Sequence, residues 1–126
     1  MRSLLPALLL LSLAAPAPLA AQAVFPPGQL GSVLGRMVTD KSGDEIGRIV
    51  DLLVDADGRP RVVVLDVGGF LGIGMRRVAV AWRTLRFSHD IADPRITEDF
   101  TLDEVAAAPE YHGADQTVRV LGAAPK

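Results

Sequence analysis

The sequence predicts a mainly β protein: a small closed or partly open β-barrel of about six strands, with one short C-terminal helix packed on it. Three observations predict this fold. Between residues 35 and 88, short apolar runs are separated by turn-forming residues. Residues 60–67 (PRVVVLDV) form a nearly continuous β-branched run, which is typical of a buried strand. One credible helix start signal follows, at Thr101.

The beginning of the 126-residue chain has the pattern of a secretory signal peptide. Arg2 precedes a leucine-rich core that is too short to cross a bilayer as a helix, and Ala21-Gln22-Ala23 matches an A-x-A cleavage site. We expect cleavage after Ala23 and a periplasmic or secreted location; the alternative is an N-terminal membrane anchor. The chain has no cysteine, so neither disulfides nor a lipid-modified N-terminal cysteine is expected.

The sequence divides into four parts. Residues 1–23 are the expected signal peptide, and residues 24–33 are a leader that contains proline and glycine without clear periodicity. Residues 34–90 carry the β pattern, and residues 91–126 form a C-terminal extension with the short helix. Because no disulfide can form, the apolar core alone must hold a domain of about 100 residues together, which is feasible at that size.

The first strands are predicted from alternation and from turn chemistry. Residues 36–39 form a short run, and DKSGD at 40–44 indicates a turn. Within residues 46–55 the even positions form an apolar face that Arg48 interrupts, so we expect a strand with one solvated face. The turn DADG follows at 55–58, and Gly58 supplies its positive φ.

Two further strands are expected after the predicted buried strand at 60–67. The glycine-rich stretch GGFLGIG occupies residues 68–74. Beyond it, residues 77–82 and 84–88 both alternate between apolar and polar side chains, with Trp82 and Phe87 on the apolar sides. The glycine-rich stretch therefore stands between two strands.

The helix signal is a capping box, in which Thr101 and Glu104 satisfy each other's backbone N–H groups. Pro109 ends the helix after roughly two turns, because proline disfavours helix in the residue before it. So short a helix is not stable alone in water, and it must pack on the barrel. Residues 118–121 form either a last edge strand or an ordered tail.

The charge distribution is uneven although the total is small. Without Arg2 the mature chain has 12 basic and 15 acidic side chains, a net charge of −3, which excludes bulk nucleic-acid binding. Residues 59–86 hold six arginines and one acid, Asp66, whereas residues 89–112 hold seven acids and one arginine, Arg95. The favoured interpretation is that the two segments lie against each other. The alternative is a basic patch that faces an anionic partner or a lipid surface.

The glycine cluster could be a phosphate-binding loop or a corner between strands. A phosphate loop needs a Lys-Ser or Lys-Thr pair that leads into a helix, so that the helix dipole and backbone N–H groups meet the phosphate. After Gly74 the chain instead continues with Met-Arg-Arg and a predicted strand. The sequence therefore favours a strand-to-strand corner whose apolar residues cover one end of the barrel.

No catalytic residues, cofactor site or metal site are predicted. DADG at 55–58 resembles a fragment of a calcium loop, but the later glutamate is missing because Val64 stands there. His89 and His112 lie in separate polar segments, so surface histidines are expected rather than metal ligands. No serine lies in a Gly-x-Ser-x-Gly context, and no carboxylate pair lies in an apolar stretch.

The order of several motifs resembles the PRC-barrel family over about residues 34–88. The motifs are GRMV at 35–38, GDEIG at 43–47, IVDLLVD at 49–55, VVVL at 62–65, GGFLGIG at 68–74 and VAV at 78–80. The resemblance implies a small barrel of about six strands and a non-enzymatic interaction domain. It supplies no catalytic residues. The family also occurs in the H subunit of photosynthetic reaction centres and in a ribosome maturation factor.

The sequence therefore predicts a PRC-barrel interaction module of the bacterial envelope that binds a protein partner or a second copy of itself. The alternative is an envelope-stress or surface-associating protein that uses its arginine-rich face for anionic lipid or polymer, with weak peripheral membrane contact. The predicted partner surface is the glycine corner with the arginines after it: Gly68, Gly69, Phe70, Leu71, Gly72, Ile73, Gly74, Arg76 and Arg77.

Overall fold

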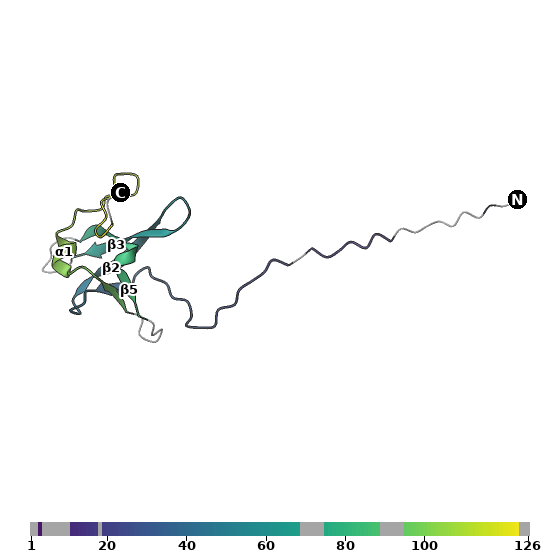
Figure 1. The fold of residues 1–126 in the computed structure, drawn as a ribbon, viewed down its shortest axis with the longest axis horizontal. Helices are drawn as coiled ribbons and strands as arrows, with labels where there is room; N and C mark the ends of the chain where they lie inside the picture. Colours follow the sequence, from purple (N-terminus) through teal and green to yellow (C-terminus); the bar gives the residue numbers. More distant parts are fainter. Residues whose placement is uncertain (1–2, 4–10, 18, 69–74, 89–94, 124–126) are drawn as a thin grey trace.

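The computed structural model describes residues 3, 11–17, 19–68, 75–88 and 95–123, which form a curled sheet with a short helix (Figure 1). The strands are β1 (Met37–Thr39), β2 (Glu45–Val54), β3 (Pro60–Val67), β4 (Arg76–Ala81), β5 (Leu85–Phe87) and β6 (Ile96–Glu98), in the sheet order β4-β3-β2-β1-β6-β5. A 3-10 turn, η2 (Trp82–Thr84), joins the two outer strands β4 and β5, and α1 spans Leu102–Ala106. The predicted mainly β fold is confirmed as a half-barrel.

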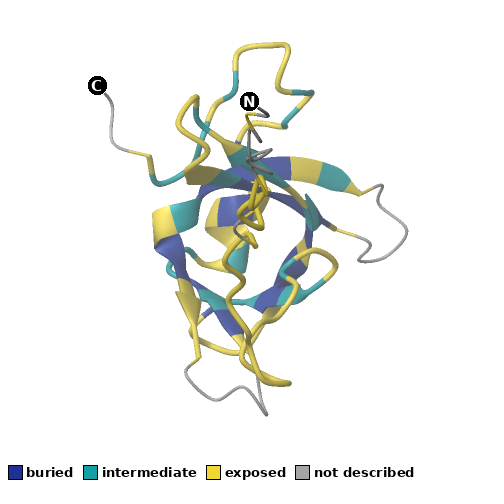
Figure 2. Cartoon of the chain, turned by 90° about the vertical axis from the view of Figure 1, so that its right-hand side faces the viewer, coloured by how far each residue is buried: buried dark blue, intermediate teal, exposed yellow. Residues whose placement is uncertain are grey.

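The longest strands form an antiparallel meander, in which β3 pairs with β2 on one side and with β4 on the other. Their interior side chains are almost entirely aliphatic, and Figure 2 shows buried residues along the curled sheet. Ile49, Val63, Leu65, Val78 and Val80 have no exposed surface. Burial of this apolar surface is the main favourable contribution to the stability of this part of the fold.

Strand β2 departs from the simple alternation that the sequence predicts. Two β-bulges reset its phase: the ladder to β1 skips Ile46, and the ladder to β3 skips Val50. Between the two bulges Ile49, at an odd position, is fully buried. Val54, on the expected apolar face, is 56% exposed at the end of the strand, where a third irregularity leaves Arg61 of β3 out of the ladder. A bulge adds one residue to one strand and so exchanges the faces beyond it.

Gly47 lies where β2 approaches its neighbours closely. A Cβ at this position would lie 2.1 Å from the carbonyl oxygen of Asp66 on β3. The obstacle is backbone rather than a flexible side chain, so only glycine fits this crossing without separating the two strands.

The other half of the sheet consists of β1, β6 and β5, three residues each. Strand β6 pairs parallel to β1 and antiparallel to β5, and sequence analysis did not predict it. The sheet therefore continues into the segment that follows residue 90. Ile96 and Glu98 both point into the interior because they lie two positions apart on one strand.

Helix α1 begins with the predicted capping box. The Thr101 hydroxyl accepts a hydrogen bond from Glu104 N–H at 3.2 Å, and the Glu104 carboxylate accepts one from Thr101 N–H at 3.0 Å. A second carboxylate, of Asp40 in the β1–β2 turn, accepts from Leu102 N–H at 3.3 Å. The helix has five residues, shorter than the expected two turns, and its buried residue Val105 joins the core.

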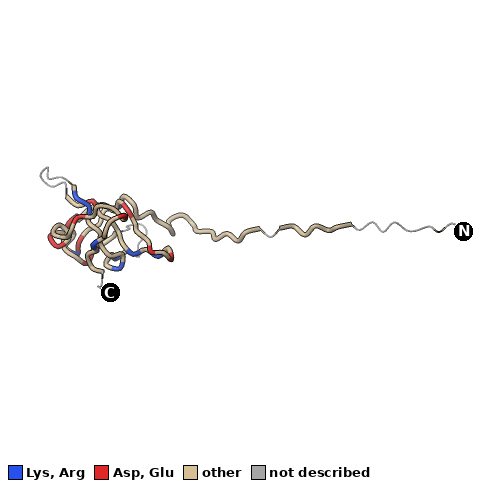
Figure 3. The backbone as a smooth tube through the Cα atoms, turned by 90° about the horizontal axis from the view of Figure 1, so that it is seen from above, with Lys and Arg blue, Asp and Glu red and all other residues tan. Residues whose placement is uncertain are grey.

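The described residues before the barrel form no helix or strand and are exposed as far as residue 32; their N-terminal part extends away from the domain (Figures 1 and 3). Within the described ranges, no helix is long and apolar enough to span a membrane. The signal peptide over residues 1–23 stays a prediction.

Candidate interaction surface

The glycine corner connects two strands of one hairpin. Gly68 follows β3 and has a φ of 115°, and Arg76 begins β4, where it pairs with Val67. The next described element after the corner is the strand β4, as the interpretation of a strand-to-strand corner expects. Gly69, Phe70, Leu71, Gly72, Ile73 and Gly74 lie outside the described residues, so their predicted role in binding stays a prediction.

The two arginines of the predicted partner surface have different environments. Arg76 donates from Nη1 to the Ala106 carbonyl at 2.6 Å and from Nη2 to the Ala108 carbonyl at 2.7 Å. Arg77 forms an ion pair with Asp66, its register partner on β3, at 3.1 Å, and its side chain is 59% exposed. Arg76 therefore holds the C-terminal extension on the barrel, while Arg77 faces solvent.

Three further arginines of residues 59–86 also have side-chain partners in the described part of the chain. Arg83 donates to the Gly122 carbonyl from Nε and Nη2, and Arg61 pairs with Asp55. Arg86 pairs with Asp99 through two hydrogen bonds, of 3.3 and 3.0 Å. The predicted pairing between the basic and acidic segments occurs as an ion pair at Arg86–Asp99, whereas Arg76 reaches the acidic segment through backbone carbonyls.

The C-terminal extension covers the outer edge of β4. Tyr111 N–H donates to the Arg77 carbonyl at 2.7 Å, Ala81 N–H donates to the Leu121 carbonyl at 2.8 Å, and Leu121 N–H donates to the Ala79 carbonyl at 3.0 Å. Residue 121 thus forms an isolated bridge to β4 and not the edge strand over 118–121 that was one of the two alternatives. One edge of the open sheet is therefore closed by the chain itself.

The opposite edge, at β5, lies beside a surface groove of about 450 Å³. One wall is the leader, and the other is the β5–β6 hairpin. The chain directly after the leader is fixed to β2, because Gly35 N–H donates to the Ile49 carbonyl at 2.7 Å and Ile49 N–H donates to the Arg36 carbonyl at 3.0 Å. The lining residues are Gly28, Gln29, Leu30, Gly31, Ser32, Val33, Arg36, Phe87, Ser88 and Ile96.

Exposed apolar side chains lie on both walls of this leader groove. Leu30 on the leader is 68% exposed, and Phe87 on β5 is 41% exposed. Phe87 also packs against Trp82, with ring centroids 5.2 Å apart. Sequence analysis missed the groove because the leader has no periodicity, and nothing in its residues shows that it returns to β5 and β6.

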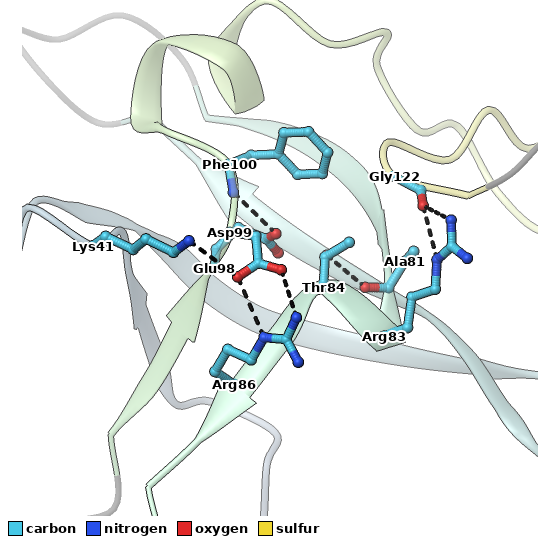
Figure 4. A network of polar contacts seen from close by, with 9 residues as sticks. All are labelled: Lys41, Ala81, Arg83, Thr84, Arg86, Glu98, Asp99, Phe100 and Gly122. Atoms are coloured by element: carbon cyan, nitrogen blue, oxygen red, sulfur yellow. Dashed lines mark hydrogen bonds and ion pairs between the residues drawn. The ribbon is translucent and has the colours of Figure 1, made fainter.

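A buried carboxyl group lies on the inner face of the β5–β6 hairpin; Figure 4 shows its polar neighbours. Glu98 on β6 has no exposed surface, and its Oε1 accepts a hydrogen bond from Phe100 N–H at 3.3 Å. Burial raises the pKa of Glu98, against the opposing effect of the hydrogen-bond donors around it. Its neighbour Asp99 has the reverse shift, because the hydrogen bond from Arg86 lowers the pKa of that carboxyl. Sequence alternation from Ile96 could have indicated that Glu98 points inward.

The remaining candidate residues are not brought together. Asp55 accepts backbone hydrogen bonds from Asp57 and Arg59, as in a tight turn. The hydrogen bond from Arg59 N–H is the main cause that lowers the pKa of the Asp55 carboxyl. His112 is exposed, and His89 lies outside the described residues. Among the residues that the structure places, no group of three or more acidic, histidine or cysteine side chains is arranged to hold a metal ion.

Comparisons with known proteins agree with the fold. The family model of the PRC-barrel domain matches residues 29–99, which include every strand of the described sheet and the last part of the leader. A comparison with curated proteins gave no match. The match covers more than half of the chain and contains the motifs that the sequence shares with this family, so the chain belongs to the PRC-barrel family.

Proposed function

We propose that this chain is a non-catalytic protein-interaction module of the bacterial envelope, which binds a protein partner or a second copy of itself. The observation that carries this proposal is the difference between the two edges of the sheet. The β4 edge is covered by the C-terminal extension, whereas the β5 edge, in the described part of the chain, has no strand beside it and borders the leader groove.

The backbone of β5 is suited to pairing with an added strand. Thr84 and Ser88 form backbone hydrogen bonds with the β6 side of the hairpin, and Arg86 lies opposite Thr97. Because backbone groups alternate in direction along a strand, the N–H and C=O of Phe87 point away from β6. An extended segment of another chain could bond to this edge and place apolar side chains in the groove.

The use of the arginines favours a protein partner over lipid or polymer. Five of the six arginines in residues 59–86 bind carbonyl or carboxylate oxygens among the described residues. A guanidinium that already binds such an oxygen contributes less to attracting an anionic surface. An anionic lipid or polymer ligand remains the alternative, and it predicts binding that weakens as the ionic strength rises past about 0.15 M.

The test compares partner capture and self-association for matched variants of the mature chain. Leu30→Asp and Phe87→Asp place a charge on either wall of the groove, and Val54→Asp is the control, because Val54 is an exposed apolar residue at the far end of β2. We expect both groove variants to abolish a cross-linked complex or a dimer seen by sedimentation, and the control to retain it. Unchanged association of folded Leu30→Asp would contradict the groove as the binding surface.

A second pair of variants tests the glycine corner that the sequence predicts. Phe70→Asp and Arg77→Glu are suitable, whereas Arg76→Glu is not, because it also releases the C-terminal extension from the barrel. Loss of association in these variants, with the groove variants unaffected, would move the interaction surface to the corner. Salt-sensitive binding to anionic vesicles without any protein complex would support the lipid alternative instead.

A further inference from the structure

Glu98 occupies an interior position that the neighbouring residues of β6 and β5 fill with apolar side chains. It lies opposite Leu85 in the β5–β6 ladder and two residues after Ile96, and both of these side chains are buried. Its Oε2 is buried and has no hydrogen-bond partner in the described structure. An ionised carboxylate with an unpaired oxygen in such a place is costly, because burial removes its hydration without replacing it.

The nearest cations both bind Asp99. Arg86 from β5 binds both oxygens of Asp99, and Lys41 from the β1–β2 turn lies 3.7 Å from its Oδ1. The other charged groups at this corner are carboxylates: Asp40 beneath the start of α1 and Glu104 in the capping box. Asp99 itself disfavours a second negative charge at Glu98. Neither cation forms an ion pair with Glu98 in the described structure, and the electrostatic effect of Arg86 on Glu98 is smaller than its interaction with Asp99.

The hydrogen positions around Glu98 also favour its neutral form. The Thr84 hydroxyl has one proton, which it donates to the Ala81 carbonyl at 2.8 Å (Figure 4). The Thr84 side chain lies next to the Glu98 carboxyl, and a hydrogen bond donated by it would lower the pKa of Glu98. With its one proton on the Ala81 carbonyl, however, the Thr84 oxygen faces Glu98 as an acceptor. A neutral Glu98 can supply a proton to it from Oε2 while Oε1 accepts from Phe100 N–H, whereas the Oε2 of an ionised Glu98 has no donor bound to it.

We propose that Glu98 is a buried proton-binding site, which in its neutral form links β6, η2 and the start of α1, and whose ionisation loosens this corner. The neutral acid completes a hydrogen-bonded chain from Phe100 N–H through Glu98 and Thr84 to the Ala81 carbonyl. When pH rises and the proton leaves, the buried charge repels Asp99 and Oε2 loses its contact. The corner then becomes less stable, together with the β5–β6 hairpin that provides Phe87 and Ile96 to the groove wall.

The direction of the pH dependence follows from proton linkage. In the unfolded chain Glu98 ionises at its ordinary pKa, whereas in the folded protein it keeps its proton to higher pH. Its stabilising contribution is complete below the unfolded pKa and is lost as pH rises through the folded pKa. Glu98→Gln keeps the shape and fixes a neutral side chain: the amide oxygen accepts from Phe100 N–H, and the amide nitrogen donates to Thr84.

The experiment measures unfolding by denaturant from about pH 4 to about pH 8 for the wild type, Glu98→Gln and the control Glu45→Gln, whose carboxyl is exposed. We expect the folding equilibrium constant of the wild type to fall relative to that of Glu98→Gln as pH rises, while Glu45→Gln follows the wild type. Parallel profiles for the wild type and Glu98→Gln would overturn the proposal.

A direct titration of the wild type keeps the test valid even if Glu98→Gln fails to fold. The chain has four glutamates, so side-chain carboxyl carbons labelled with carbon-13 give four signals by NMR. We expect the Glu98 signal to change at a pH above the ordinary range of a glutamate, together with the amide signals of Phe100 and Thr84. A Glu98 signal that titrates within or below that ordinary range would overturn the proposal.

Discussion

The two halves of the curled sheet are stabilised by different interactions. In the half formed by β2, β3 and β4 the strands are long, and the interior consists of valine, leucine, isoleucine and alanine. In the half formed by β1, β6 and β5 the strands have three residues each, and the buried polar residues Asp40, Thr84 and Glu98 lie there. Short strands bury little apolar surface, so hydrogen bonds to buried side chains take a larger share.

This difference predicts that the stability of each half depends on a different kind of change. The long-stranded half should respond to changes of side-chain volume, whereas the short-stranded half should respond to loss of a hydrogen-bond partner and to pH. The second half also carries the β5 edge and one wall of the leader groove. The proposed binding surface therefore lies on the half of the sheet that small polar changes alter most easily.

The largest effect is expected for Gly47→Ala in the long-stranded half. The new Cβ would meet the Asp66 backbone, so the β2–β3 crossing must open, at a cost of about 3 kcal/mol in the free energy of unfolding. Gly58→Ala is the control, because its Cβ meets open space and only its positive φ of 77° is strained. Denaturant unfolding measures both; a Gly47→Ala effect no larger than that of the control would show that the strands separate easily.

A smaller effect is expected for Asp40→Ala in the short-stranded half. Asp40 Oδ1 accepts from the backbone N–H groups of Ser42 and Asp44, and Oδ2 accepts from Leu102 N–H. Leaving these donors without a partner should lower the free energy of unfolding by about 2 kcal/mol. Asp44→Ala, an exposed change in the same turn, should cost much less. Equal losses in the two variants would mean that the link from Asp40 to α1 contributes nothing.

The smallest effect is expected for Arg86→Ala, which removes one of the two exposed cations that pair with Asp99. Since Arg86 lowers the pKa of Asp99, the contribution of this pair is present above the unfolded pKa of Asp99 and is lost as pH falls through its folded pKa. This direction is opposite to that of Glu98. The difference between Arg86→Ala and wild-type stability should also shrink at high salt. A difference that persists in high salt at acidic pH would assign Arg86 a role other than this ion pair.

Much of the long-stranded half and the start of α1 could be predicted from the sequence. The strand Pro60–Val67 coincides with the β-branched run, and the capping box of Thr101 and Glu104 forms as expected. These features depend on residues close together in the chain, where side-chain pattern and turn chemistry act directly. The family motifs lie in the same region, and the match to the PRC-barrel model extends over it.

The tertiary structure alone decided the features that depend on residues far apart. The bulges at Ile46 and Val50 arise from how three strands fit together, and a single strand's alternation contains no sign of them. Strand β6 is too short to give a recognisable alternation in the sequence, and it forms because β1 and β5 pair with it on either side. The hydrogen bonds of Arg76 and Arg83 to carbonyls of the C-terminal extension could not be predicted from residue types, because every residue carries a backbone carbonyl.

The sequence by itself thus determined the β character, the turns, the helix start and the family, since these follow from local pattern. The folded chain decided which sheet edge is covered, where the leader lies and why Glu98 is buried. The physical reason is that hydrogen bonding and burial between distant segments depend on their positions in space, which local side-chain pattern constrains only loosely.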